Sequence, residues 1–164
     1  MTFFKTLFNF FLFTLLFTNI SYAEDSMKFA TNIEASFKVN ADSMFIDKVS
    51  LEGGLSGSVN INQGPLDFKS DQMSFTCTDD EEMPIITNLF ASQNVVISNE
   101  DMTASGNNAS YSVKKNEILL EGNVIVKNNF TTMKGEKLFI DLETGKINFL
   151  SDGKQNNRIR GQLL

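Results

Sequence analysis

The sequence contains no histidine and a single cysteine, Cys77. Nucleophilic catalysis needs a base beside the nucleophile, and histidine supplies that base most often. The sequence also lacks a Gly-x-Ser-x-Gly motif and a glycine-rich phosphate loop. We therefore expect a protein that is not an enzyme. Zinc and copper sites rely on histidine and cysteine ligands, so we also expect no metal and no cofactor.

A lone cysteine also excludes an internal disulfide bond, so packing must hold the fold together. We interpret Cys77 as a small side chain at the end of a strand. Basic residues are outnumbered: 14 lysines and arginines stand against 20 acids, which gives a formal charge of −6 at pH 7. Nucleic acids are bound through basic surfaces, so this balance argues against a nucleic-acid partner.

Apolar runs long enough to span a membrane are absent, although the N-terminus carries a shorter one. Residues 6–17 form an apolar run of 12 residues, whereas a membrane-spanning helix needs about 20. Lys5 precedes the run, and Ser21-Tyr22-Ala23 follows it with small residues where a signal peptidase reads them. This layout is typical of a secretory signal peptide over residues 1–23, cleaved after Ala23. The exported chain, residues 24–164, then suits one domain.

The exported chain has no 3.6-residue apolar period sustained over ten residues, so we expect almost no helix. Instead, three stretches share a strand-like pattern that starts at Val59, Val95 and Val124. Counted from each start, apolar residues recur two, nine, fourteen and sixteen positions later, and a polar residue lies twelve positions later. We interpret each copy as three short antiparallel alternations separated by turns. The second turn is placed at the polar residue, which is Asp71, Asn107 or Glu136.

Strand-like alternation begins at Phe37. We therefore predict a flexible lead-in over residues 24–36 and one β-domain over residues 37–164. Turns are expected at residues 63–65, 128–129 and 143–146, and a bend at Gly53-Gly54. The pattern breaks at the acidic run Asp79–Glu82. We interpret this run as a solvated loop, because calcium loops space their ligands at alternate positions around a glycine.

Several short motifs resemble those of a known family. Residues 39–44 (VNADSM) and 55–64 (LSGSVNINQG) resemble the start of an OstA-type domain. Residues 108–111 (NASY), 119–126 (LLEGNVIV), 134–138 (KGEKL) and 149–152 (FLSD) resemble its second half. The resemblance covers roughly residues 37–160. With these motifs and the signal peptide, the chain resembles the LptA/OstA family of periplasmic lipopolysaccharide transport proteins.

That resemblance implies an all-β fold: an open, slightly twisted antiparallel β-jellyroll with unpaired edges at both ends. It also implies a periplasmic carrier that binds the acyl chains of lipopolysaccharide in an apolar groove and passes them from inner to outer membrane. The implied partners are lipopolysaccharide with its lipid A, LptC-like and LptD-like transport proteins, and further copies of the chain joined head to tail.

Alternating strands supply an apolar groove physically, because residues two apart share one face. Burying acyl chains there contributes about 25 cal/mol per Å². Ordinary core packing explains any one of these side chains, and only the whole set in an open jellyroll favours a lipid. The predicted groove residues are Val59, Ile61, Phe68, Met73, Phe75, Val95, Ile97, Met102, Tyr111, Val124, Val126, Met133, Leu138 and Ile140.

The predicted first strand, around residues 37–39, and the predicted last strand, around residues 157–163, contain no proline. Proline often protects an exposed sheet edge. We therefore predict that both ends stay open for strand addition to partners. Disorder at the termini is the alternative. The predicted edge residues are Phe37 and Val39 at one end and Asn157 and Ile159 at the other.

Two other functions remain open from the sequence. One is an LptC-like component that shares the fold but keeps its N-terminal helix as an inner-membrane anchor. The short apolar run and Ser21-Tyr22-Ala23 disfavour this alternative. The other is a structural β-repeat scaffold protein with a filled core and no lipid ligand.

Overall fold

The computed structural model describes residues 36–79, 85–150 and 159–163. They form one ten-stranded antiparallel sheet in the order β1-β3-β4-β5-β6-β7-β8-β10, in which β2 also pairs with β3 and β9 with β8. No helix occurs within these ranges, and therefore none that could cross a membrane. The strands are β1 (Phe37–Asn40), β2 (Ser43–Asp47), β3 (Glu52–Gln63), β4 (Leu66–Cys77), β5 (Ile86–Ser98), β6 (Met102–Ser112), β7 (Glu117–Asn128), β8 (Thr131–Asp141), β9 (Ile147–Leu150) and β10 (Arg160–Leu163).

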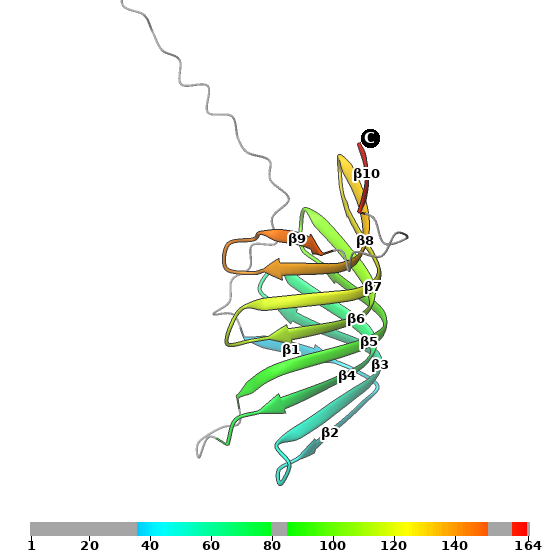
Figure 1. The fold of residues 1–164 in the computed structure, drawn as a ribbon. Coiled ribbons are helices and arrows are strands. Elements are labelled where there is room, and N and C mark those ends of the chain that lie inside the picture. Colours follow the sequence, from blue (N-terminus) through cyan, green and yellow to red (C-terminus); the bar gives the residue numbers. More distant parts are fainter. Residues whose placement is uncertain (1–35, 80–84, 151–158, 164) are drawn as a thin grey trace, which may run out of the picture.

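The long strands β3 to β8 bend near their middle, and the bends are aligned along one side of the molecule (Figure 1). The sheet therefore has two layers that are joined at the bend. Layer A contains β2, residues 52–56, 72–77, 86–92, 108–112, 117–121 and 137–141, and β9. Layer B contains β1, residues 59–63, 66–69, 95–98, 102–105, 124–128 and 131–134, and β10.

The bend has the same local cause in each of the hairpins β3–β4, β5–β6 and β7–β8. The register shifts there, so that two residues of the first strand lie opposite one residue of the second. Such a β-bulge kinks a strand and increases its twist. Both residues of each bulged pair are left-handed, a conformation that glycine and asparagine adopt most readily. The left-handed pairs are Gly57 and Ser58 opposite Asp71, Gln93 and Asn94 opposite Asn107, and Gly122 and Asn123 opposite Glu136.

The sequence repeat is therefore a bulged hairpin. Val59, Val95 and Val124 each follow directly after a left-handed pair. The prediction of three short strands per copy was wrong, because the polar residue lies inside a continuous strand and not in a turn. The alternation changes phase at that residue, since the bulge opposite it shifts the register. The all-β, open antiparallel fold is confirmed.

The turn predicted at residues 63–65 is found at 64–65, and the one predicted at 128–129 lies one residue later, at 129–130. Strands β8 and β9 pair around the predicted turn at 143–146. The bend predicted at Gly53-Gly54 was wrong, because both glycines lie inside β3. A methyl group on Gly53 would overlap the ring of Phe75, and one on Gly54 would overlap the ring of Phe45. These glycines thus make room for two aromatic rings.

The apolar core lies between the two layers. Its buried side chains form one cluster from Leu55 to Leu142, and the buried polar side chains in the described part of the chain are Gln63 and Ser70. The predicted signal peptide lies outside the described residues. So do the lead-in up to residue 35 and residues 80–84, which include most of the acidic run.

Candidate functional site

The fourteen predicted groove residues lie on one surface, the inner face between the layers. They come from all six long strands, β3 to β8. Thirteen of them are at most 6% exposed, and Met133 is half-buried. The structure thus brings the whole predicted set together, although their contact with lipid stays a prediction.

The inner face also contains apolar residues that the sequence analysis left out. Leu55, Ala91 and Leu120 lie four residues before the start of a repeat, and Leu89 and Ile118 lie six before. Extending the alternation back across the left-handed pair would have found them. The remaining buried apolar residues outside the predicted set are Leu66, Ala104, Ala109 and Leu142.

The inner-face side chains pack against one another as one cluster. A ligand between the layers would have to part them. One buried hydrogen bond crosses the gap: Tyr111 Oη in layer A donates to Gln63 Oε1 in layer B at 3.0 Å. Burial raises the pKa of the Tyr111 phenol.

The two ends of the inner face differ in exposure. At the β1–β2 end, Val39, Met44 and Ile46 pair with Ile61, Leu55 and Gly53 and therefore share their inner side. Their exposed fractions are 40%, 60% and 55%. The apolar interior is thus uncovered at this end.

At the opposite end the interior is better covered. Ile147 and Phe149 of β9 are partly buried against the core cluster. The ring of Phe149 lies over Gly135, where an added Cβ would come within 2.6 Å of Phe149 Cδ1. This glycine lets the ring close off the last layer of the cluster.

The predicted edge residues lie at the two ends of the sheet. Phe37 and Val39 belong to β1, which pairs on one side with β3 and has no strand on its other side among the described residues. Ile159 immediately precedes β10 and is 44% exposed. Asn157 lies outside the described residues.

Sequence analysis missed that each end has an edge strand in both layers. In layer A these strands are β2 and β9. Phe45 in β2 and Leu150 in β9 are 65% and 45% exposed. The exposed Met44-Phe45-Ile46 run at an unpaired edge was the signal for β2.

The outer faces are more polar. A hollow of about 640 Å³ on the outside of layer A lies between Phe45 and Phe90, over serines such as Ser74 and Ser110. Most of its lining is polar or outward-facing, while the inner-face residues Leu55, Met73 and Ala91 also border it. Within the described ranges, no three acidic or thiol side chains are grouped closely enough to hold a metal ion.

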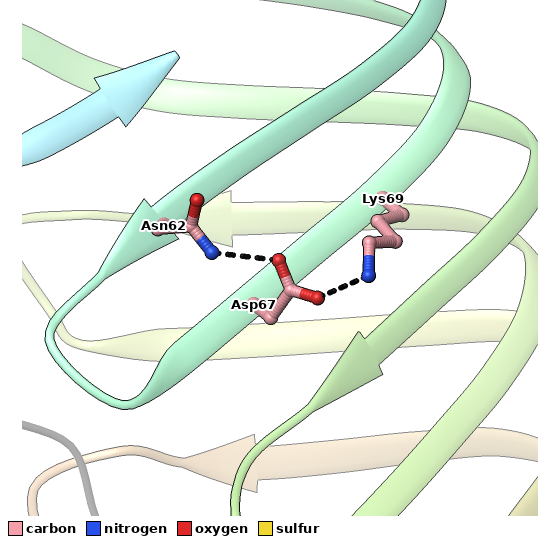
Figure 2. Close-up of polar contacts among 3 residues, drawn as sticks. All are labelled: Asn62, Asp67 and Lys69. Carbon is pink, nitrogen blue, oxygen red and sulfur yellow. Dashed lines mark hydrogen bonds and ion pairs between the residues drawn. The ribbon is translucent and has the colours of Figure 1, made fainter. Parts of the chain in front are cut away.

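The outside of layer B shows how side chains meet across a hairpin. Asn62 Nδ2 donates to Asp67 Oδ1 at 2.7 Å, and Lys69 Nζ lies 2.5 Å from Asp67 Oδ2 (Figure 2). An exposed ion pair of this kind contributes little to stability. The Asn62–Asp67 hydrogen bond shows that side chains directly opposite each other in the β3–β4 ladder come into contact on this face.

Comparisons with known proteins point to one family. The family model described as "LptA/(LptD N-terminal domain) LPS transport protein" matches residues 38–146, about two thirds of the chain. Among curated protein sequences there is no match.

A similar solved structure is that of LptH from Pseudomonas aeruginosa, described as the LptA-homologous periplasmic component of the lipopolysaccharide transport device. The two chains share 18% identity with a TM-score of 0.68, over 82% of this chain and 97% of LptH. At this identity the likeness shows a shared fold. On the strength of the family match, the chain belongs to the LptA/LptD N-terminal domain family of lipopolysaccharide transport proteins.

Proposed function

We propose that this protein is a periplasmic carrier that holds the acyl chains of lipopolysaccharide between its two layers and passes them toward the outer membrane. The observation that supports this most is the inner face, where apolar side chains from six strands are continuous and are exposed at the β1–β2 end. Family membership supports lipopolysaccharide as the cargo.

The chemistry of the inner face suits a saturated chain. Its buried side chains in the described residues are apolar except for Gln63 and Ser70. An acyl chain needs apolar surface and no specific polar partner, so each Å² of lipid buried there contributes about 25 cal/mol. Methionine side chains such as Met73 and Met102 adapt to irregular chains. This gain would act against the cost of parting the layers.

Val39, Met44 and Ile46 provide the entry to this interior. They are inner-face residues that are exposed to solvent. A lipid that first binds there can insert its chains between the layers without crossing a polar surface. The aligned bends on one side of the molecule (Figure 1) would keep the layers joined while a ligand parts them on the opposite side.

Location and partners follow from the same proposal. The predicted signal peptide directs export, and cleavage after Ala23 releases a soluble chain; LptH is itself described as periplasmic. Among the described residues, β1, β2, β9 and β10 each have one edge without a neighbouring strand, and these edges are available to LptC-like and LptD-like proteins and to other copies of the chain. Strand addition at such edges forms main-chain hydrogen bonds without requiring a pocket.

Photo-crosslinking tests the lipid-binding face. A photoreactive residue at Ile61, Ile97 or Val126 is expected to capture lipopolysaccharide in cells. The matched outward neighbours, Asn60 and Val96, are expected to capture much less. Equal capture at both sets would show that the inner face is not the binding face.

Two further measurements separate the alternatives. N-terminal sequencing of the exported protein should start at Glu24, whereas a start at Met1 would indicate an anchored, LptC-like component. Native mass spectrometry after gentle extraction should show a bound mass of the size of lipid A. A chain that never carries such a mass would instead be a scaffold protein.

A further inference from the structure

We propose that the two sheet edges are complementary halves of one bulged hairpin, and that a second copy of the chain completes this hairpin in one defined strand register. The inference depends on the proposed head-to-tail association and specifies which residues meet. It comes from extending the repeat to both ends of the sheet.

The β1–β2 edge is the second half of a repeat. The repeat places inner-face residues at positions nine, fourteen and sixteen, and these correspond to Val39, Met44 and Ile46. Position twelve is polar and corresponds to Asp42, which lies opposite the left-handed pair of β3. Its backbone amide donates to the carbonyl oxygens of Ser56 and Gly57 at 3.1 and 3.0 Å.

The turn that follows β2 supports this assignment independently. Asp47 lies five residues after Asp42, as Asp141 lies five after Glu136. Oδ1 of Asp47 accepts from the amides two and three residues on, at 2.8 and 3.3 Å. Oδ1 of Asp141 makes the same pair of bonds, at 2.9 and 3.0 Å. The two strands therefore end in the same way.

The β9–β10 edge is the first half of a repeat. Phe149 and Ile147 pair with Leu138 and Ile140. Ala91 and Leu89 make the corresponding pairs, with Met73 and Phe75, where one hairpin adjoins the next. In layer B, Gly161 pairs with Met133 as Ile97 pairs with Phe68. Ile159 thus stands at the position of Val95.

The sequence before β1 does not repeat the apolar pattern of a first half at the spacing of the other hairpins. Its four inner-face positions, by the same spacing, are residues 24, 26, 30 and 32. They are Glu24, Ser26, Ala30 and Asn32, so three of the four are polar. The edge strands β9 and β10 of a second copy carry the apolar face that fits this edge, with Ile147, Phe149 and Ile159 at three of the four positions.

Superposing the two halves on the β3–β4 hairpin fixes the register between copies. In layer A, Phe149 takes the place of Leu55, and Met44 of the next copy takes the place of its partner Met73. In layer B, Gln162 takes the place of Asn62, and Lys38 of the next copy takes the place of its partner Asp67. The resulting pairs are Ile46 with Ile147, Met44 with Phe149, Asp47 with Lys146, Asn40 with Arg160 and Lys38 with Gln162.

The chemistry of these pairs is complementary. Ile46 and Met44, which are 55% and 60% exposed in one copy, meet the apolar Ile147 and Phe149 of the next. The Asp47 carboxylate comes opposite the Lys146 ammonium. Opposite charges at an edge select register more than they add affinity. A shift by one residue would turn the apolar side chains outward.

The pair Lys38 and Gln162 is the most direct to test, because its equivalent within the chain is visible. That equivalent is Asp67 and Asn62, whose side chains meet at 2.7 Å on the outside of layer B (Figure 2). Cysteines at Lys38 and Gln162 of two copies should therefore lie close enough for a disulfide bond.

The experiment mixes two exported proteins in a Cys77→Ala background, one carrying Lys38→Cys and the other Gln162→Cys. Oxidation in concentrated solution is expected to give a disulfide-linked dimer, read by non-reducing electrophoresis and mass spectrometry. An intrachain Asn62→Cys, Asp67→Cys protein is the positive control for geometry. The shifted pair Lys38→Cys with Arg160→Cys is expected to crosslink at least about tenfold more slowly, because it is displaced by two residues.

Three results would overturn the proposal: faster crosslinking of the shifted pair, equal crosslinking of both pairs, or no crosslinking while the positive control forms its bond. Lipid capture at Ile61, Ile97 and Val126 is measured on the same proteins. Capture without the Lys38–Gln162 bond would refute the register and leave the carrier function standing. The bond without capture would refute the carrier function and leave the register standing.

Discussion

The phenol of Tyr111 in β6 donates a hydrogen bond to the amide oxygen of Gln63 in β3, and this 3.0 Å hydrogen bond joins layer A to layer B. Both side chains are buried, at 1% and 3% exposure, and both lie on the face where acyl chains are proposed to bind. Any ligand that parts the layers at this point must break the bond. Tyr111 therefore helps to hold the layers together, and its ionisation can be used to detect changes in the interior.

Replacing Tyr111 with phenylalanine is expected to lower the free energy of unfolding by about 1 to 2 kcal/mol, because a buried hydrogen bond is lost while the ring remains. Urea denaturation followed by circular dichroism measures the change. The double variant Tyr111→Phe, Gln63→Leu should lose less than the sum of the two single variants. Additive losses would mean that the two side chains are not coupled.

Tyr111 is expected to ionise above the ordinary tyrosine pKa of 10.0, because burial raises it. Its contribution to stability is therefore complete below pH 10 and is lost as the pH rises through the raised folded-state value. Absorbance at 295 nm measures the titration in the exported protein, residues 24–164, where Tyr111 is the only tyrosine. Denatured protein provides the unshifted reference, and coincident curves would contradict the prediction.

Gly122→Ala is expected to destabilise the protein by at least about 1 kcal/mol, because φ is +79° and the added Cβ would lie 2.6 Å from Asn107 Nδ2. Gly161→Ala is the matched control: an added Cβ there has nothing within 4 Å. Its change in thermal stability should be within about 0.5 kcal/mol. Similar effects at both glycines would remove the bulge as the explanation.

Asp141 is expected to stabilise its turn at neutral pH and to stop doing so in acid. The hydrogen bond from the Thr144 amide is the main cause that lowers the pKa of this carboxyl below 3.8. The contribution is present above the unfolded-state value and is lost as the pH falls through the lower folded-state value. The stability gap between the native protein and Asp141→Ala, measured by urea denaturation from pH 6 to pH 2, should therefore narrow below pH 4.

Alternation in the sequence was enough to predict the strand class and the inner face. Residues such as Ile97 and Val126 lie on that face because side chains two apart in a strand share one side. The resemblance supplied the open jellyroll, which alternation alone does not specify. Without it, a closed sheet and an open one would have been equally consistent with the pattern.

The bend was not predictable from the same reasoning. A phase change in the alternation at Asp71 looks the same whether the chain turns or the opposite strand bulges, because both shift the side chains by one position. The information lay on the other strand, at Gly57 and Ser58, some 13 residues earlier. The exposed ends of the inner face also depend on which strands lack neighbours, and pairing is a long-range property.

The line of left-handed pairs has a consequence for the size of the molecule. Each hairpin has its own bulge and pairs with the next hairpin in the same way, so the hairpins are equivalent structural units. Duplicating or deleting one such block would lengthen or shorten the interior without disturbing its cross-section. The span available to a cargo is thus counted in hairpins, both inside one chain and along a row of chains.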